Sequence, residues 1–358
     1  MTLEEKLMYR CLELAGKGAG YVSPNPLVGC VIAKNNKIIA EGYHKKFGSN
    51  HAEVKAINSA IKKGINLKGS ELYVNLEPCS HYGKTPPCVD KIIEHKISKV
   101  IIGIKDPHPL VSGKGIRKLR QNGIEVKAGV LENECKELNR FFLKYVKTGL
   151  PYITIKTAQT LDGKIADKNY NSKWISSFES RKLVHKLRRV FDAVLIGKNT
   201  VKYDNPSLTV RHAKGRNPYR IVIDGKLELN LNKKLFSDRF KHKTIVITSN
   251  NVSKKKIHNF ERKNIKVICC KTKEGLIDLK DALRKIARLG ITSILVEGGA
   301  FTSTEFLKKN LDDANMIFIA PKIMGEGIDA FNTSIDLRWY KKINYHRSGK
   351  DILINIKK

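Results

Sequence analysis

Four residues in the first hundred have the types and spacing of a metal-dependent hydrolytic site. Cys79 and Cys88 follow the apolar stretch YVNLEP and are separated by the eight residues SHYGKTPP. Upstream, the segment HAEVKA places His51 and Glu53 at the expected start of a helix. One imidazole and two thiolates make a three-ligand set for Zn²⁺ that leaves a fourth position for water, as in catalytic zinc sites. Glu53 is then close enough to exchange protons with that water.

Each part of this pattern also has an ordinary interpretation. A lone His51 is usually a surface or capping residue, and two cysteines are often buried structural thiols. In this order, however, H-x-E followed by P-C and a second cysteine is the signature of zinc nucleobase deaminases. The sequence therefore predicts His51, Cys79 and Cys88 as zinc ligands, with Glu53 as the catalytic acid and base. His81, inside the loop, is a rival ligand, although a substrate contact suits it better.

The composition sets the broad class of the protein. A chain of 358 residues with 41% hydrophobic residues is long enough for two globular domains. No apolar stretch approaches the roughly 20 residues of a membrane helix, and the start MTLEEKLMYR does not resemble a targeting segment. The seven cysteines are irregularly spaced and fit reduced thiols or metal ligands better than disulfides. We therefore expect a cytoplasmic protein without a membrane partner.

The net charge of +34 raises the alternative of nucleic-acid binding. Residues 1–150 carry 25 basic and 14 acidic side chains, and residues 151–358 carry 43 and 20, scattered singly through every segment. The densest runs, such as SKKK at 253–256, are short and lack interleaved aromatic residues. We interpret the charge as a lysine-rich surface that attracts small phosphorylated substrates, and a polyanion-binding role remains the alternative.

The order of expected elements predicts an α/β fold in two domains. A capping box of Thr2 and Glu5 begins a helix that runs to about residue 15, and the segment 27–43 has the pattern of a hairpin. Strands and helices then alternate to the helix ENECKELNRFFLKYVK, which indicates an α/β sandwich. Gly149 and Pro151 end that helix, so we place the domains at 1–148 and 149–358. The second domain repeats the alternation, although its stretch 226–290 shows no recognisable chemistry.

At this point a family resemblance becomes specific. The blocks SPNPLVGCVI, HAEVKAI, LEPCSHYGKTPPC and DPHPLVSGKG occur in order over residues 20–115. Together they resemble the deaminase half of the bifunctional deaminase/reductase of riboflavin biosynthesis. The eight-residue loop is typical of that family, because cytidine and tRNA adenosine deaminases use the shorter P-C-x-x-C spacing. The resemblance implies a cytidine-deaminase-like α/β/α sandwich, and a substrate that is a diaminohydroxypyrimidinone with a phosphoribosylamino group.

The same resemblance suggests further substrate contacts in the first domain. Zinc-activated water would attack the ring carbon that bears the exocyclic amine, and ammonia would leave. Asn25, in the PNP turn, matches a position that faces the pyrimidine, although it has an alternative as a plain turn residue. His81, Lys84 and Asp106 lie in matching loops and could meet polar groups or the phosphate. Charged loop residues are usually only solvated, which is the alternative for these three.

The second half resembles the reductase domain of the same family, whose fold is like that of dihydrofolate reductase. The matching blocks are KTAQTLDGKIA, SKWIS, HKLRRVFDAVLIGKNTVKYDNPSLTVR and ILVEGGAFTSTEFL. In the last block a glycine turn opens a helix, which allows close approach of a phosphate to free N–H groups. The G-x-G-x-x-G fingerprint of a Rossmann fold is absent from the sequence. The resemblance implies NADPH as the cofactor.

Carried over position by position, the resemblance names the residues of this second site. Positions that match cofactor contacts are Ala158, Trp174, Thr200, Asp204, Gly299, Ala300, Phe301, Thr302, Ser303, Thr304 and Glu305. Positions that match substrate contacts are Ser172, Arg188, Leu208, Arg211 and Glu297. The implied reaction is hydride transfer to C1 of the ribose after its ring opens to an imine. The two arginines suit a phosphate, because a guanidinium binds phosphate oxygens in a bidentate way.

Some of these residues have alternatives. Asp204 is expected to assist the proton transfer of ring opening, and its alternative is an Asx turn before Asn-Pro. Trp174 is either a pocket wall or core packing. Thr160 stands where the family commonly has serine, and Lys198 stands where a small residue is usual. We hypothesise that Lys198 attracts the extra phosphate of NADPH.

The sequence thus predicts a cytoplasmic homo-oligomeric enzyme that performs two consecutive riboflavin-pathway steps with Zn²⁺ and NADPH. Its partners are small phosphorylated pyrimidines, and no nucleic acid is expected. The first alternative is a basic RNA-binding zinc deaminase, which would show basic stripes with stacking aromatic residues and the short cysteine spacing. The second alternative is the same fold with only one active half.

Overall fold

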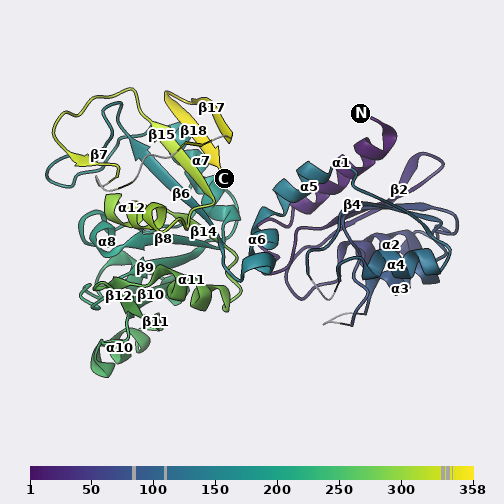
Figure 1. The fold of residues 1–358 in the computed structure, drawn as a ribbon, viewed down its shortest axis with the longest axis horizontal. Helices are drawn as coiled ribbons and strands as arrows, with labels where there is room; N and C mark the ends of the chain where they lie inside the picture. Colours follow the sequence, from purple (N-terminus) through teal and green to yellow (C-terminus); the bar gives the residue numbers. More distant parts are fainter. Residues whose placement is uncertain (83–85, 109–110, 332–334, 336–338, 341) are drawn as a thin grey trace. The chain divides into compact units, whose positions relative to one another are not determined.

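The computed structural model describes residues 1–358 except 83–85, 109–110, 332–334, 336–338 and 341. The chain divides into two compact units, Met1–Gly149 and Leu150–Lys358, each built around its own sheet (Figure 1). No helix in the described part of the chain has both the length and the apolar character that crossing a membrane requires.

The first unit contains a five-stranded sheet in the order β2-β1-β3-β4-β5. Its strands are β1 (Gly29–Lys34), β2 (Lys37–Tyr43), β3 (Glu71–Leu76), β4 (Lys99–Ile104) and β5 (Glu125–Ala128). β1 is antiparallel to both β2 and β3, and the pair with β2 confirms the expected hairpin. β3, β4 and β5 are parallel. The loops that follow β3 and β4 therefore begin at the same edge of the sheet.

Helices cover both faces of this sheet (Figure 1). α1 (Leu3–Gly16) and α5 (Glu132–Leu138) lie on one face, and α2 (Ala52–Lys62), α3 (Cys88–Glu94) and α4 (Lys114–Gln121) lie on the other. The capping box of Thr2 and Glu5 is confirmed at the start of α1. α1 packs closely on β1, because a Cβ at Gly29 would lie 2.1 Å from the Cys11 carbonyl oxygen. The predicted α/β/α sandwich is confirmed.

The last helix of this unit differs from the expected single helix. It is divided into α5 and α6 (Arg140–Thr148) at Asn139, whose φ of −97° and ψ of 15° leave the helical region. The Asn139 side chain is buried, accepts from Leu27 N at 2.8 Å and donates to Leu27 O at 3.0 Å. A side chain committed to a distant loop thus explains a break that the local sequence pattern does not show.

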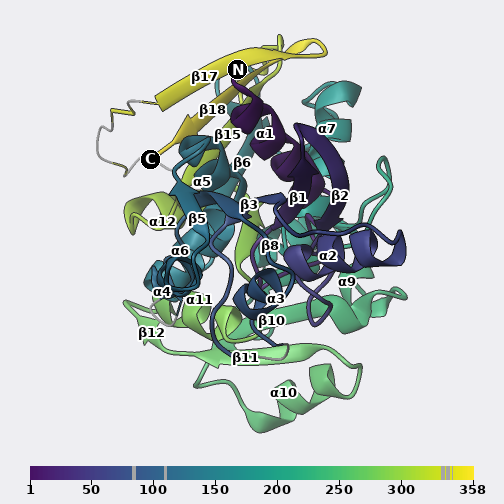
Figure 2. The ribbon, with the colours of Figure 1, turned by 90° about the vertical axis from the view of Figure 1, so that its right-hand side faces the viewer.

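The second unit contains a nine-stranded sheet in the order β11-β10-β9-β8-β14-β6-β15-β18-β17. The strands from β11 to β15 are parallel, and β18 and β17 are added antiparallel at one edge. Figure 2 shows β17 and β18 in yellow as a long hairpin. The strands are β6 (Tyr152–Gln159), β8 (Ala193–Gly197), β9 (Tyr219–Ile223), β10 (Thr244–Ser249), β11 (Lys266–Cys270), β14 (Ser293–Val296), β15 (Ala314–Ile319), β17 (Lys342–Ser348) and β18 (Asp351–Lys357). Two short pairs, β7 (Lys164–Ala166) with β16 (Ile328–Asp329) and β12 (Thr272–Lys273) with β13 (Leu276–Ile277), stand outside it.

The central strands of this sheet are apolar because both of its faces are covered. β8 and β14 are buried along almost their whole length, as expected for parallel strands. The helices are α7 (Phe178–Val190), α8 (Lys198–Asp204), α9 (Lys234–Ser237), α10 (Lys254–Glu261), α11 (Leu279–Ala287) and α12 (Ala300–Lys308), and Lys241–Lys243 forms a 3₁₀ turn. The carboxyl ends of β6, β8 and β14 meet at one edge, where α/β sheets commonly bind ligands.

Candidate active sites

The three residues predicted as zinc ligands converge in the first unit. His51 is the N-cap of α2, Cys88 is the first residue of α3, and Cys79 lies in the loop after β3. His51 Nδ1 is 3.3 Å from Cys88 Sγ and 3.6 Å from Cys79 Sγ, and the three ligand atoms lie within 4.8 Å of one another. Tetrahedral Zn²⁺ with bond lengths near 2.1 and 2.3 Å separates its nitrogen and sulfur ligands by about 3.6 Å. The spacing therefore suits a zinc ion bound by these three atoms.

The pKa values of the two cysteine thiols also suit the binding of a cation. A hydrogen bond from the Cys88 thiol lowers the pKa of Cys79 to about 4. The same contact, together with burial, raises the pKa of Cys88. Cys79 Sγ also accepts from the Cys88 backbone N–H at 3.4 Å, at the start of α3. A metal ion binds both sulfurs as thiolates and releases the proton that they share.

Glu53 lies beside this group in the first turn of α2. It is 3% exposed, and its Oε2 atom has no hydrogen-bond partner among the described residues. Burial raises the pKa of Glu53, while His51 opposes that shift. A buried carboxylate oxygen with no partner in the protein is costly. It is explained if a water molecule or a substrate proton is its partner.

His44, which the sequence analysis did not single out, connects Asn25 to this site. His44 is 2% exposed, and burial lowers its pKa to about 4, so its ring is neutral. Its Nδ1 faces the Asn50 carbonyl oxygen at 3.3 Å, and its Nε2 faces Asn25 Nδ2 at 3.2 Å. Nδ1 therefore carries the proton and Nε2 accepts from Asn25. This pairing orients the Asn25 amide, and the His44 ring contacts the His51 ring with centroids 5.6 Å apart.

The remaining loop residues are placed differently. His81 is exposed and is not part of the three-ligand group, and Lys84 lies outside the described residues. Asp106 accepts from His108 N at 2.8 Å and is held by the buried Glu77, which accepts the Asp106 N–H. Glu77 also accepts from Gly113 N and Ile116 N, so it joins Asp106 to the start of α4. The sequence analysis gave Glu77 no role, because its partners are more than 25 residues away.

The second unit contains a cavity of about 1440 Å³ at the carboxyl ends of β6, β8 and β14. Most residues predicted for the second site line it, namely Ala158, Ser172, Trp174, Arg188, Thr200, Asp204, Arg211, Glu297, Gly299, Ala300, Phe301, Thr302 and Glu305. Leu208, Ser303 and Thr304 are buried and are not among its lining residues. α12 begins here with no side-chain cap, so its first N–H groups are available to an anion. Gly298 must be glycine, because a Cβ there would lie 2.7 Å from Thr302 Cβ.

A cluster of charged residues lines part of this cavity. Arg188 of α7 makes a bidentate ion pair with Glu297, with distances of 2.7 and 2.8 Å, and also donates to Thr209 O at 3.2 Å. Burial alone would raise the pKa of Glu297, but Arg188 outweighs burial and lowers it. Since Arg188 uses most of its donors in this way, Arg211 is the better candidate of the two arginines for a phosphate.

Lys156, which the sequence analysis missed, completes the cluster. It projects from β6 into the cavity, and burial lowers its pKa while Glu297 partly offsets that effect. A lysine within the otherwise strand-like YITIKTA was the one available signal, because β6 is a central strand where a cation needs a partner or a function. The cavity therefore contains a cation that can give up its proton more readily than a surface lysine.

The structure shows the surroundings of Asp204 and Trp174, for each of which the sequence left two interpretations. Asp204 ends α8, and its Oδ1 accepts the Ser172 hydroxyl at 3.1 Å, so the carboxylate contacts another residue that lines the cavity. Burial raises the pKa of Asp204, and the Ser172 hydrogen bond opposes that shift. The Trp174 side chain is 64% exposed beneath the Arg181 guanidinium, 4.4 Å from the ring centroid. Core packing is therefore the wrong interpretation of Trp174, which lies at the cavity wall.

Thr160 and Lys198, the two positions that depart from the family pattern, each have an identified polar partner. The Thr160 hydroxyl accepts from Lys164 N at 2.9 Å and so shapes the turn before β7. Lys198 lines the cavity but also pairs with Glu228 at 2.6 Å, and both side chains are nearly half exposed. Exposed pairs contribute at most about 1 kcal/mol. Glu228 therefore neutralises part of the Lys198 charge that, in our hypothesis, attracts the additional phosphate of NADPH.

We expect Lys198→Ala to raise the KM for NADPH by no more than about fivefold, because an exposed charge contributes about 1 kcal/mol or less. The KM for NADH should stay unchanged, since the effect requires the additional phosphate. Steady-state kinetics with both nucleotides measure this, and Lys202→Ala on the same helix is the control. An unchanged NADPH/NADH preference would remove the hypothesis.

Comparison with known proteins agrees with both halves. Residues 1–104 match the family model described as the cytidine and deoxycytidylate deaminase zinc-binding region, and residues 151–352 match the RibD C-terminal domain. The riboflavin biosynthesis protein RibD of Aquifex aeolicus is 45% identical over 362 residues, which cover 99% of each chain. The chain belongs to the RibD family. The chain thus contains both the deaminase zinc-binding region and the reductase domain of RibD proteins, as the resemblance predicted.

Solved structures from the RibD family support the same conclusion. A deaminase/reductase from Thermotoga maritima, described as a diaminohydroxyphosphoribosylaminopyrimidine deaminase and 5-amino-6-(5-phosphoribosylamino)uracil reductase, is 41% identical with a TM-score of 0.88, over 99% of this chain and 98% of that one. Acinetobacter baumannii RibD is 32% identical with the same TM-score of 0.88 and the same coverage. The predicted fold, a cytidine-deaminase-like domain followed by the RibD reductase domain, is confirmed. As a RibD enzyme of riboflavin biosynthesis, the chain joins a zinc-binding deaminase half to a reductase half.

Proposed function

We propose that this chain catalyses two consecutive reactions. The first is deamination of 2,5-diamino-6-(5-phosphoribosylamino)pyrimidin-4(3H)-one. The second is the NADPH-dependent reduction of the ribosyl group of 5-amino-6-(5-phosphoribosylamino)uracil. The observation that carries the proposal is the convergence of His51, Cys79 and Cys88 within 4.8 Å in a chain whose whole length matches RibD proteins. An RNA-binding deaminase would not require the second cavity.

In the first reaction, His51, Cys79 and Cys88 would hold a zinc ion. When bound, Zn²⁺ supplies Lewis acidity that makes a water molecule nucleophilic near neutral pH. Glu53 takes the proton from the attacking water and returns it to the leaving amine, so that ammonia departs. Its burial suits this role, because a raised pKa lets the carboxyl group hold the proton between the two steps. Asn25, whose amide nitrogen is oriented by His44, offers its amide oxygen to a donor on the pyrimidine.

In the second reaction, α12 would bind the cofactor phosphates through its first N–H groups. When bound, the reduced nicotinamide supplies the hydride that reaches C1 of the ribose. Asp204, whose pKa is raised by burial, delivers a proton to the ring oxygen as the ring opens. The glycosidic nitrogen gives up its own proton as the imine forms and takes it back as hydride reaches C1, and we assign both transfers to Lys156, whose pKa burial lowers. Arg211 binds the phosphate of the substrate.

Incubating the purified protein with the deaminase substrate, with and without NADPH, tests both steps. Ammonia should be released in both samples, and NADPH should be consumed only after deamination. NADPH oxidation without ammonia release would show that only the second half is active. Ammonia release without NADPH oxidation would show the converse.

Metal analysis provides an independent check. We expect one zinc per chain in the purified protein, because the described residues offer one three-ligand group. Cys88→Ser should lower the zinc content to a small fraction and abolish ammonia release, since a hydroxyl is a poor substitute for a thiolate ligand. NADPH oxidation with the pre-deaminated substrate should be unaffected. Cys269→Ser, which changes a thiol remote from the group in sequence, is the control.

We further propose that the enzyme works in the cytoplasm as a homo-oligomer, with small phosphorylated pyrimidines rather than nucleic acid as its partners. The seven cysteines are all free thiols, which suits a reducing compartment. Light scattering after size-exclusion chromatography would give the oligomeric state, and a monomer mass would contradict that part of the proposal.

A further inference from the structure

The loop that follows Asp204 has no regular secondary structure and yet has a fixed backbone. It comprises residues 205–211 and ends at Arg211, which lines the cavity. Asn205 and Leu208 have positive φ angles of 44° and 52°. Asparagine adopts this conformation readily, but a leucine adopts it rarely and mainly where its surroundings hold it. Side chains from several other elements hold this loop in place.

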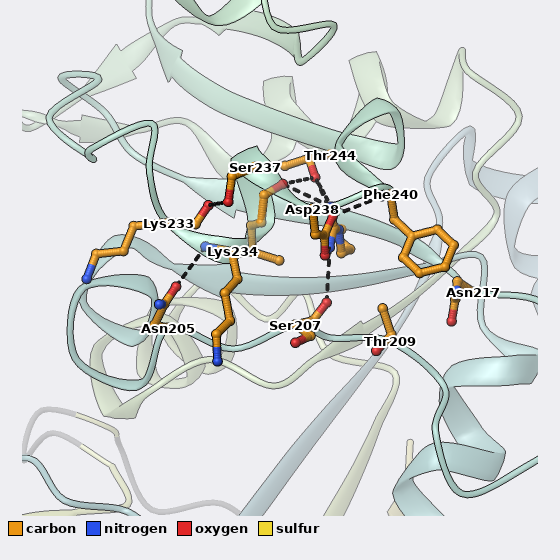
Figure 3. Close-up of polar contacts among 12 residues, drawn as sticks. Asn205, Ser207, Thr209, Asn217, Lys233, Lys234, Ser237, Asp238, Phe240 and Thr244 are labelled. Atoms are coloured by element: carbon orange, nitrogen blue, oxygen red, sulfur yellow. Dashed lines mark hydrogen bonds and ion pairs between the residues drawn. The ribbon is translucent and has the colours of Figure 1, made fainter.

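The first part of the loop is anchored to the sheet through Arg220 of β9. Figure 3 shows Ser207 of the loop close to Asp238 and Thr244. Arg220 is 1% exposed and donates to Ser207 O at 3.2 Å. Its remaining donors are used by both Asp238 oxygens, at 2.6 and 2.9 Å, and by the Thr244 hydroxyl. Asn205 Oδ1 also accepts from Lys234 N at 2.9 Å. The stretch after residue 226, to which the sequence analysis gave no chemistry, therefore supports this loop.

The second part of the loop is anchored beside the cavity. Thr209 O accepts from Arg188, and Val210 N donates to Asn217 Oδ1 at 2.8 Å. Arg211 N donates to His185 Nδ1 at 3.0 Å. His185 of α7 is 5% exposed, lines the cavity and lies one turn before Arg188. The hydrogen bond to His185 therefore fixes the backbone at Arg211 itself, the residue whose side chain lines the cavity.

The protonation state of His185 follows from this contact. Because Nδ1 accepts an N–H, the ring must be neutral and carry its proton on Nε2. Burial, with Arg188, Arg211 and His212 nearby, lowers the pKa of His185 to about 4, and Glu297 opposes that shift. The acceptor at Nδ1 is therefore present throughout the physiological range.

We propose that His185 is a positioning residue for the reduction, which fixes the backbone of Arg211 so that its guanidinium meets the substrate phosphate. This inference rests on the proposed function of the second unit and on the role of Arg211 in it. His185 acts through the loop and takes no part in hydride or proton transfer. Its loss should weaken substrate binding and leave cofactor binding intact.

The test uses the full-length enzyme with 5-amino-6-(5-phosphoribosylamino)uracil and NADPH. His185→Phe keeps the ring and removes the acceptor, and we expect the KM for the uracil substrate to rise about 10- to 100-fold, since small misplacements of positioning groups have effects of this size. The kcat should change less than threefold, and the NADPH dissociation constant should not change. His185→Asn retains an acceptor near Nδ1 and should restore most of the affinity.

The control is His212→Phe, which changes the neighbouring ring, 4.7 Å from that of His185, without removing a loop contact. Its KM should equal that of the wild type. Equal KM values for His185→Phe and the wild type would overturn the proposal, and so would a parallel loss of NADPH binding or a failure of His185→Asn to restore affinity. If the wild type itself oxidises no NADPH, the proposed function fails instead.

Discussion

Glu53→Gln is expected to lower the kcat of deamination by about 10³- to 10⁴-fold, which is the upper range for removal of a general acid–base group. The amide keeps the shape of the side chain, so the zinc ligands stay in place. It cannot carry a proton from the attacking water to the leaving amine. Ammonia release measured at saturating substrate, with zinc content determined on the same sample, gives both quantities.

The outcome separates two roles of this carboxyl group. Zinc retained at one per chain with deamination lost supports proton transfer by Glu53. Loss of zinc from a folded variant would mean that Glu53 holds the metal and would contradict the proposed role. Glu41→Gln, on the edge strand β2, is a matched control, because Glu41 pairs with Arg10 at the surface, and its deamination should be unchanged.

Asp204→Asn is expected to lower the rate of reduction by about 10²- to 10³-fold while ammonia release stays at the wild-type level. The amide can still accept the Ser172 hydrogen bond but has no proton to give when the ribose ring opens. Because burial raises the pKa of Asp204, its protonated form persists to higher pH than that of a free aspartic acid, and wild-type reduction should slow as pH rises through this raised pKa. Single-turnover NADPH oxidation across pH measures both effects.

Asp238→Asn provides the comparison for this variant, since Asp238 belongs to the Arg220 network and does not line the cavity. We expect a lowered free energy of unfolding and a much smaller effect on the rate. Equal damage to ammonia release and NADPH oxidation by Asp204→Asn would contradict separate sites for the two reactions.

The sequence predicted the residues whose spacing is local and whose chemistry is restrictive. His51, Cys79 and Cys88 stand out because few residue types bind zinc, and the two domains follow from the alternation of strands and helices. His44 and Lys156 were not predicted, because the role of each depends on groups that the fold places beside it, Asn25 and Asn50 for His44 and Glu297 for Lys156. A lone histidine after a hairpin or a lysine within a strand has no pattern that separates it from a surface residue.

Long-range hydrogen bonds account for the other differences. The break at Asn139 depends on Leu27, which lies 112 positions earlier in the chain. Arg220 has no local sequence pattern that sets it apart from other strand residues, and its role comes from Asp238 and the Ser207 carbonyl, which the fold places around it. Local sequence propensity does not indicate any of these pairings. The loop at 205–211 and the side chains that hold it could therefore be found only in the structure.

The Asn139 contacts determine where the two halves can be separated for independent expression. Asn139 holds both backbone groups of Leu27, and Asn75 donates to the same Leu27 carbonyl while accepting from Gly29 N. The turn that bears Asn25 is therefore secured by a residue close to the exit of the first unit. A fragment that stops at residue 138 would leave the Leu27 N–H without its Asn139 partner and the Leu27 carbonyl with Asn75 alone, and so loosen that turn. A fragment that continues to residue 149 retains both Asn139 contacts.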